Sequence, residues 1–228
     1  AVSEEIRSTI VSRCGVEPCR VSLIPNGVEK ELFPPLRPSA LGIAVDVPTV
    51  VYAGNMASYQ GVELLLEAFA DAARQLPGLR LQILTDGSFE PYALLSQSLG
   101  IGGRIQVERT SLEQLPQELL AAHVAANPRT ACDGLPQKLL NYMAAGCPIV
   151  SFAGSARHLV HEENALIVDD GDVAAFSAAI LRLVRDREFA RRLGRNAQSQ
   201  VRNHMTWQHA ATRIEQVYDR VTGAAVPD

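Results

Sequence analysis

Cysteines are few in this sequence and long apolar runs are missing, and both absences narrow the class of protein. The 228 residues include four cysteines, none in a C-x-x-C pair, and five histidines that form no recognisable metal-binding pattern with them. We therefore expect reduced thiols, as in a cytoplasmic protein, and no bound metal. No stretch reaches the roughly 18 apolar residues of a membrane span, and the N-terminus lacks the basic and then apolar profile of a signal peptide. The chain is expected to be soluble.

A block of charge of one sign is also missing. The net charge is −4, and the one basic stretch is a loose run of arginines between residues 185 and 195. Nucleic acid is therefore not an expected partner. The length, with 47% hydrophobic residues, suffices for one sizeable core.

From Pro48 onward, short apolar runs alternate with longer amphipathic stretches. This pattern predicts an α/β fold, with a Rossmann-like, doubly wound parallel sheet covered by helices on both faces. The predicted strands are 49–53, 79–84, 105–108, 124–127, 148–151 and 165–168. The predicted helices are 62–76, 92–99, 113–122, 136–145, 155–160, 173–185, 188–200 and 206–221.

Residues 1–47 are predicted to be a leading segment, separate from the sheet domain over 48–228. A helix over 3–14 and a strand over 20–24 precede a Pro-Asn-Gly turn. A proline-marked linker follows, at Pro34, Pro35, Pro38 and Pro48.

The loops after the strands carry the candidate site, because ligands of open parallel sheets bind beyond the carboxyl ends of the strands. The first such loop runs from Gly54 to Gly61, the second covers 85–88 and the third covers 109–111. The first two also have a purely structural interpretation as ordinary turns.

The fourth loop leads into the stretch from Asp133 to Val150, which has the pattern of a loop, a helix, a tight turn and a strand. Pro136 suits a first helical turn and Gly146 a helix end. The residues expected near the helix N-terminus, where anions are attracted, are Gly134, Leu135, Gln137, Lys138 and Asn141. Alternatively, Asp133 only caps the helix.

The run Gly-Leu-Pro-x-Lys-Leu-x-x-Tyr-Met-Ala-Ala-Gly-x-Pro-Ile-Val at 134–150 resembles the donor-site motif of family 4 glycosyltransferases, which are retaining, nucleotide-sugar-dependent enzymes of the GT-B fold. The resemblance continues in three further places: Ile24 to Val28 with Phe33, Val51 to Asn55 with Tyr59 to Gly61, and Trp207 with Tyr218. It spans nearly the whole chain in the family's order and spacing.

The resemblance implies that this chain is the C-terminal half of a GT-B glycosyltransferase. Such a half binds the nucleotide-sugar, which is a substrate, and no cofactor is implied. The chain starts at Ala1 within an expected helix, so we expect a fragment that is inactive without an N-terminal, acceptor-binding domain. The last helix is implied to cross back to that domain, and the full-length protein is open to peripheral association with a membrane.

The family usually carries two glutamates eight positions apart, where this chain has Asp133 and Asn141. The first is implied to be the catalytic position that holds the sugar, and the second to take the ribose hydroxyls. In the first loop, Asn55 and Gln60 replace the Arg and Lys that hold the diphosphate. The implied donor-binding residues are Gly54, Asn55, Gln60, Gly61, Thr110, Gly134, Leu135, Lys138 and Asn141.

Those four substitutions leave open a second interpretation, a degenerate GT-B module that binds or scaffolds without catalysis. The glycines at 54, 61, 134 and 146, with Pro136 and Lys138, argue against it because they set the backbone shape of the site. A GT-B epimerase or phosphorylase is a third interpretation, disfavoured by the Asn-Gly-Val turn and the pattern from Trp207 to Tyr218.

Overall fold

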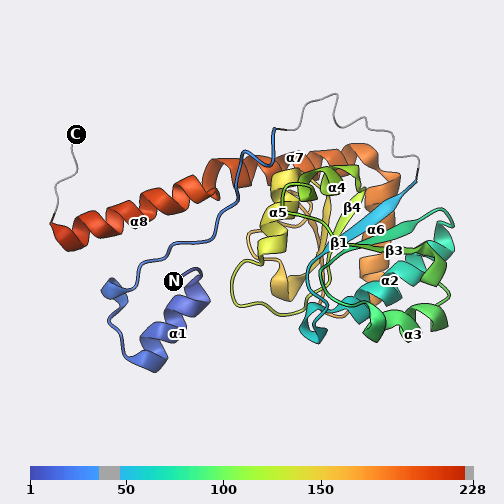
Figure 1. The fold of residues 1–228 in the computed structure, drawn as a ribbon, viewed down its shortest axis with the longest axis horizontal. Coiled ribbons are helices and arrows are strands. Elements are labelled where there is room, and N and C mark those ends of the chain that lie inside the picture. The colour runs from blue at the N-terminus through green and yellow to red at the C-terminus, as the bar shows by residue number, and fades with distance from the viewer. Residues whose placement is uncertain (36–46, 224–228) are drawn as a thin grey trace.

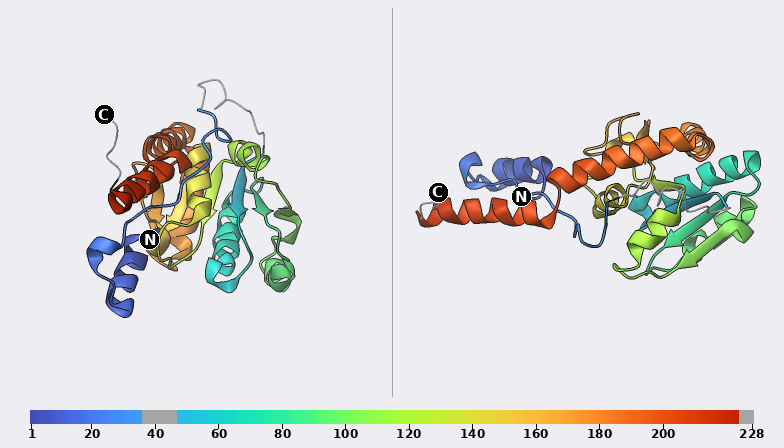
Figure 2. Two further views of the ribbon diagram at one scale, coloured as in Figure 1. Left: turned by 60° about the vertical axis from the view of Figure 1, so that its left-hand side comes forward. Right: turned by 90° about the horizontal axis from the view of Figure 1, so that it is seen from above.

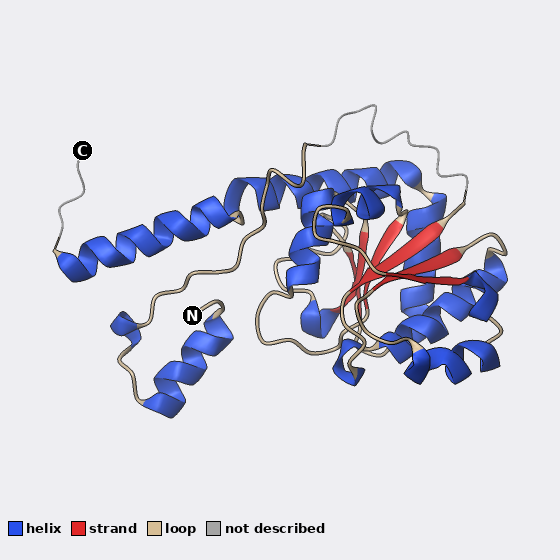
Figure 3. Cartoon of the chain, viewed as in Figure 1, coloured by secondary structure: helices blue, strands red, loops and turns tan. Residues whose placement is uncertain are grey.

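The computed structural model describes residues 1–35 and 47–223, and a parallel sheet lies at its centre (Figures 1 and 3). The strands within these ranges are β1 Thr49–Ala53, β2 Arg80–Leu84, β3 Ile105–Glu108, β4 Val124–Asn127, β5 Ile149–Phe152 and β6 Leu166–Val168. They pair in the order β3-β2-β1-β4-β5-β6, and each neighbouring pair is parallel. This is the order of the Rossmann-like doubly wound sheet, so the predicted fold class is confirmed.

Helices cover both faces of the sheet (Figure 2). On one face pack α2 Val62–Gln75, α3 Glu90–Ser98 and α6 Val173–Arg185, and on the other α4 Leu115–Ala121 and α5 Gln137–Ala145, while α7 Arg187–His204 contributes to both cores. Val50 and Tyr52 point into the first core and Val51 into the second. Because β1 is buried on both sides, it is a continuous apolar run rather than an alternating one.

The helix after β1 has an apolar stripe that its sequence predicts from residues at helical spacing: Val62, Leu65, Leu66, Phe69, Ala72, Ala73 and Leu76. Its members Val62, Leu65, Leu66, Phe69, Ala72 and Ala73 are all buried. Leu76, the last predicted member, is the C-cap residue and packs against the core while partly buried. The 3.6-residue period was therefore sufficient to identify the face that meets the sheet.

The strand predicted over 20–24 is wrong. Residues 21–27 follow a short 3-10 turn, Pro18–Arg20, and have no strand pairing. A strand requires a hydrogen-bonded neighbour, and here other groups use the carbonyls. The Arg7 Nε donates to Val21 O at 3.0 Å, and the N-terminal amine donates to Ser22 O at 2.8 Å.

The helix predicted over 155–160 is also wrong. The chain makes a single 3-10 turn at Ala153–Ser155 and then a loop. His158 has φ 62°, in the left-handed region, and Asn164 Oδ1 accepts from the Val160 amide at 2.7 Å. A side chain thus takes an amide that a helix would have used.

Several helix boundaries differ from the prediction by one to four residues, and those of α5 and α7 have a clear physical reason. Pro136 is the N-cap of α5 rather than its first helical residue, since its ψ is 133°. Helix α7 begins at Arg187, where the Asp186 side chain accepts from the Phe189 amide at 2.9 Å, and it extends to His204.

Two helices lie to one side of the sheet domain, α1 Glu4–Cys14 and α8 Trp207–Thr222 (Figure 1). Of α8, only Ala210 is buried, and Trp207 and Tyr218 are 46% and 65% exposed. Most of α8 is therefore exposed. Within the described ranges, no helix is long and apolar enough to cross a membrane.

The chain crosses itself where it enters and leaves the sheet domain. The Val28 amide donates to Met205 O at 3.0 Å, and the Trp207 amide donates to Val28 O at 3.1 Å. A Cβ added to Gly27 would come under 3.0 Å from the Thr206 backbone, so only glycine fits this crossing. The division at 47/48 stays a prediction, and part of the predicted linker, including Pro38, lies outside the described residues.

Candidate functional site

The loops after β1 and β4 meet at the point where the strand order reverses. Gly61, with φ 71°, lies so close to the loop after β4 that an added Cβ would come under 3.0 Å from Pro128 O. The loops that follow the carboxyl ends of β1 and β4 are therefore in contact. Crevices at such switch points are the usual ligand sites of open α/β sheets.

A hollow of about 320 Å³ occupies this edge of the sheet. It is lined by Ala53, Gly54, Asn55, Leu84, Thr85, Asp86, Gly87, Thr110, Leu115, Gln137, Lys138 and Asn141. Five of the predicted donor-binding residues are among them, drawn from the loops after β1 and β3 and from α5. The fold therefore brings together residues that are up to 87 positions apart, from Gly54 to Asn141.

The loop after β1 is organised by Asn55. Its Oδ1 accepts from the Ala57 amide and from Gln60 Nε2, both at 3.2 Å, and its Nδ2 donates to the Tyr59 hydroxyl at 3.2 Å. The Tyr52 hydroxyl donates to Asn55 O at 2.7 Å. The two amides that replace the family's cations thus hydrogen-bond within the loop and fix its shape.

Lys138 extends from α5 into this loop. Its Nζ donates to Gln60 Oε1 at 2.5 Å and to the Tyr52 hydroxyl at 3.3 Å, and it lies 4.4 Å from the centre of the Tyr52 ring. Burial, and then the charge of Arg129, lower the pKa of Lys138 to about 7. In the part of the chain that the structure describes, the hydrogen-bond partners of this amine are neutral, so the amine is available to an anion.

Tyr142 joins α5 to the ends of β1 and β4. Its hydroxyl accepts from the Ala53 amide at 2.7 Å and faces the carbonyls of Ala53 and Ala126 at 3.3 and 3.4 Å. Burial raises the pKa of Tyr142 well above its usual value. Helix α5 starts without a side-chain cap, and Gln137 and Lys138 of its first turn line the hollow. Sequence reasoning missed Tyr142, although a tyrosine within an apolar helix stripe signals a buried hydroxyl with a partner.

Asp133, Gly134 and Leu135 are predicted site residues that do not line the hollow. Asp133 is exposed, whereas Gly134, with φ 103°, is buried against Ser3, the N-cap of α1. Leu135 packs against the core of α5. The loop predicted to hold the sugar therefore lies beside the start of α1.

Metal ligands do not gather anywhere in residues 1–35 and 47–223: no three His, Cys, Asp or Glu side chains there could hold an ion. His158 and His161, which follow β5, are exposed.

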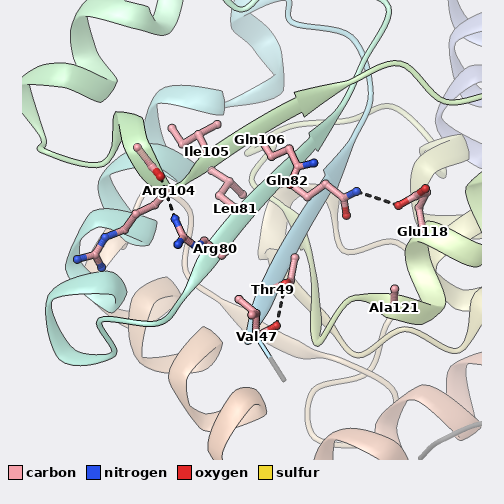
Figure 4. Close-up of a pocket in the computed structure, with 11 residues that line it drawn as sticks. Val47, Thr49, Arg80, Leu81, Gln82, Arg104, Ile105, Gln106, Glu118 and Ala121 are labelled. Carbon is pink, nitrogen blue, oxygen red and sulfur yellow. Dashed lines mark hydrogen bonds between the residues drawn. The ribbon is translucent and has the colours of Figure 1, made fainter. Parts of the chain in front are cut away.

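A second hollow, of about 510 Å³, lies at the opposite edge of the sheet, where β1, β2 and β3 begin (Figure 4). Its polar wall is formed by Gln82, whose Nε2 donates to Glu118 at 2.8 Å and to Glu108 at 3.0 Å. Arg80 on its rim donates to Gly103 O at 2.9 Å. None of the predicted site residues lines it, and it lies far from the switch point.

The strand order, the two-sided helix layers and the crevice at the switch point define a Rossmann-like α/β domain. The sequence pattern of the family described as glycosyl transferases group 1 matches residues 47–186. The chain belongs to this family, as its sequence motifs predicted.

Similar curated proteins and solved structures agree with this assignment. The D-inositol 3-phosphate glycosyltransferase of Corynebacterium efficiens is 25% identical over 97% of this chain, and the match covers 56% of that protein. The chain thus spans about half the length of this curated relative. The solved sucrose-phosphate synthase of Thermosynechococcus elongatus superposes with a TM-score of 0.82 at 26% identity, over 99% of this chain and 58% of that one. HepE of Anabaena, solved with UDP, superposes with a TM-score of 0.81 at 17% identity, over 98% of this chain and 63% of that one.

Proposed function

We propose that this domain binds a nucleotide-sugar and is the donor half of a retaining glycosyltransferase. The observation that carries the proposal is the position of Lys138, a buried amine with neutral partners, beside the uncapped start of α5. A helix N-terminus and a cation together favour a diphosphate. Structures of Anabaena HepE with UDP and with UDP-glucose, which share this fold, support a nucleotide-sugar as the ligand.

The proposed roles follow the walls of the hollow. The diphosphate lies against Gly54, where the absent side chain allows close approach, and against Lys138. Asn141, which lines the same hollow, meets the ribose hydroxyls, and the loop of Thr110 borders the base. Asp133, which lies outside the hollow, is proposed to hold the sugar together with the amides that follow it.

In the proposed reaction the bond between the sugar and the diphosphate breaks, and the acceptor oxygen bonds to the same face. The diphosphate takes the bonding electrons, so its negative charge grows in the transition state. Lys138 and the amides at the start of α5 stabilise that charge and need no reorganisation to do so. The leaving phosphate is proposed to accept the acceptor's proton, and no cofactor takes part. The acceptor and its binding groups come from outside this chain.

A non-catalytic binding module is the competing proposal. Two observations favour it: the amides of Asn55 and Gln60 hydrogen-bond within their own loop, and Asp133 does not line the hollow. A module of this kind would still bind a nucleotide but would transfer no sugar in any longer form of the protein.

Thermal unfolding with added UDP, GDP, ADP or dTDP tests donor binding. Binding at 100 times the dissociation constant adds about 2.7 kcal/mol to the free energy of unfolding, which is a measurable rise in Tm. We expect one nucleotide to raise Tm and the variant Lys138→Met to reduce that rise. A folded sample whose Tm none of the four changes contradicts the proposal. If one nucleotide does raise Tm, turnover by a longer chain distinguishes the enzyme from the binding module.

A further inference from the structure

No residue of the loop from Gly54 to Gly61 carries a charge, yet a second cation lies against it. The guanidinium of Arg129, in the loop after β4, stacks 4.9 Å from the centre of the Tyr59 ring. We propose that Arg129 is a second phosphate-binding residue of the donor site, acting together with Lys138. This inference rests on the proposed function and adds a residue that the sequence motifs do not include.

Buried polar side chains hold the backbone of Arg129 in place. Ser155 Oγ donates to Arg129 O, and Asn127 Nδ2 donates to Ser155 Oγ at 2.7 Å and to Ser151 Oγ at 2.8 Å. These three polar residues are buried. A fixed backbone lowers the entropy cost of presenting a long side chain to a ligand.

The side chain of Arg129 is also oriented. Its Nε donates to Ala131 O, and its planar group stacks on Tyr59, which Asn55 holds through the Tyr59 hydroxyl. Its two terminal nitrogens have no hydrogen-bond partner in the part of the chain that the structure describes. Guanidinium nitrogens that are oriented and have no partner are suited to a bidentate contact with phosphate oxygens.

The electrostatics indicate an anion. Arg129 lies close enough to Lys138 to contribute to the lowered pKa of that amine. Neither residue is within ion-pair distance of a carboxylate among residues 1–35 and 47–223. Neighbouring cations repel each other, and a diphosphate between them would remove that repulsion. The charge missing from the loop after β1 is thus provided by the loop after β4 and by α5.

The test is isothermal titration of the wild type and variants with UDP, GDP, ADP, dTDP and inorganic pyrophosphate. For the nucleotide that binds the wild type, we expect Arg129→Gln to weaken binding about ten- to hundredfold, the range for a hydrogen bond to a charged group. Arg129→Lys, which keeps the charge, should lose less. Arg74→Gln is the matched control, because it removes the same charge from an exposed site on α2 and should leave affinity unchanged.

The outcomes separate the inference from the proposed function. If the wild type binds one nucleotide and Arg129→Gln binds it equally well, the inference is wrong while donor binding stands. If the folded wild type binds none of the five probes, both fail. The corresponding nucleoside monophosphate gives a second readout: Arg129→Gln should weaken the diphosphate more than the monophosphate, and an equal loss for both would show a merely structural role. Unchanged Tm of the unliganded variant establishes that it is folded.

Discussion

Lys138 is a lysine among neutral partners, and this explains both its lowered pKa and its proposed use. Burial penalises the ammonium form, and the nearby Arg129 adds to the penalty. The Gln60 oxygen and the Tyr52 ring and hydroxyl hold the amine in place without neutralising it. A diphosphate that binds here supplies the missing negative charge, so binding and protonation are coupled.

We therefore predict that donor affinity falls as pH rises from about 7 to 9. The bound diphosphate raises the pKa of Lys138, so above pH 7 the complex takes up a proton, and affinity falls by at most about tenfold per pH unit. Phosphate groups titrate near pH 6 and are constant in this window. Titration calorimetry in buffers of different ionisation enthalpy measures the uptake at pH 8. An affinity independent of pH in the wild type would contradict the coupling, and Lys138→Gln should abolish it.

Lys138 should also lower the free energy of unfolding of the domain. The folded-state pKa of about 7 lies below the usual 10.5, so between these values the unfolded chain binds more protons and stability rises with pH. Below pH 7 both states are protonated and the full penalty remains. We predict that Lys138→Met is more stable than the wild type by about 1–2 kcal/mol at pH 6, allowing for partial exposure, and that the gain shrinks towards pH 10. Urea denaturation at the two pH values checks this, and a gain that grows with pH would contradict it.

Asn141 is a position at which a substitution should strengthen nucleotide binding. It lines the hollow where the family usually has a glutamate. Asn141→Glu should bind the donor nucleotide about tenfold more tightly, because hydrogen bonds to a charged group are stronger than those to a neutral one. Asn141→Gln, which has the length without the charge, is the control and should not gain. Weaker binding by Asn141→Glu would remove Asn141 from the ribose contact. Asp133→Glu belongs in the same series, scored by transfer in a longer chain.

Among the elements, α5 and α7 are the pair whose packing fixes the site. Gly194, in the middle of α7, is buried against the carbonyl of Gly146, the residue that ends α5. A Cβ at Gly194 would come under 3.0 Å from that carbonyl. Gln198, one turn later, donates to Ala144 O at 2.8 Å. The close approach of α7 therefore holds the C-terminal end of α5, whose N-terminal end forms the hollow.

Gly194→Ala should destabilise the domain, although alanine is the better helix former. The gain in helix propensity is about 1 kcal/mol, whereas forcing a methyl group into a packed contact costs about 1–3 kcal/mol. Because the contact is with backbone, the cost should lie in the upper half of this range, so we expect a net loss of about 1–2 kcal/mol in urea denaturation. Gly78→Ala is the matched control, since its Cβ would meet nothing within 4 Å, and it should stay within about 0.5 kcal/mol of the wild type. A Gly194→Ala variant as stable as the wild type would contradict the close packing.

Elements with a strong local pattern could be predicted from the sequence, and elements that depend on distant partners could not. The stripe of α2 is periodic and the strands are short apolar runs between turns, so the positions of these elements followed from the sequence. The run 20–24 alternates like a strand, but its carbonyls are used by groups near α1. In the site, Lys138 and Asn141 follow from a motif, whereas Arg129 depends on its approach to Tyr59, 70 residues earlier. No sequence pattern encodes that contact.

At the scale of the whole molecule, the buried core and the flanking helices differ in how well they are held. The sheet and the helices on its faces form two buried cores. Helix α1 has no buried residue within its bounds, and α8 has one, Ala210. The apolar residues of α8 that remain exposed are Trp207, Ile214, Tyr218 and Val221.

We predict that amide hydrogen exchange in the isolated chain is much faster in α8 than in α5 or α7. Local opening is cheap where few apolar contacts are lost, so protection in α8 should fall well below the global value. Mass-spectrometric exchange of peptides covering 207–222 and 137–145 measures the difference. Equal protection of the two peptides would mean that α8 is covered in solution.

The crossing of the chain at Gly27 and Thr206 also bears on protein engineering. Because Val28 pairs with the backbone on either side of Thr206, the polypeptide enters and leaves the sheet domain at one point. A segment whose two ends are adjacent can be grafted into a surface loop of a host protein with little strain on the host. We therefore expect that residues 28–206 can be inserted as a unit into a host protein. A nucleotide that binds the inserted domain would stabilise it and would make the stability of the host depend on that ligand.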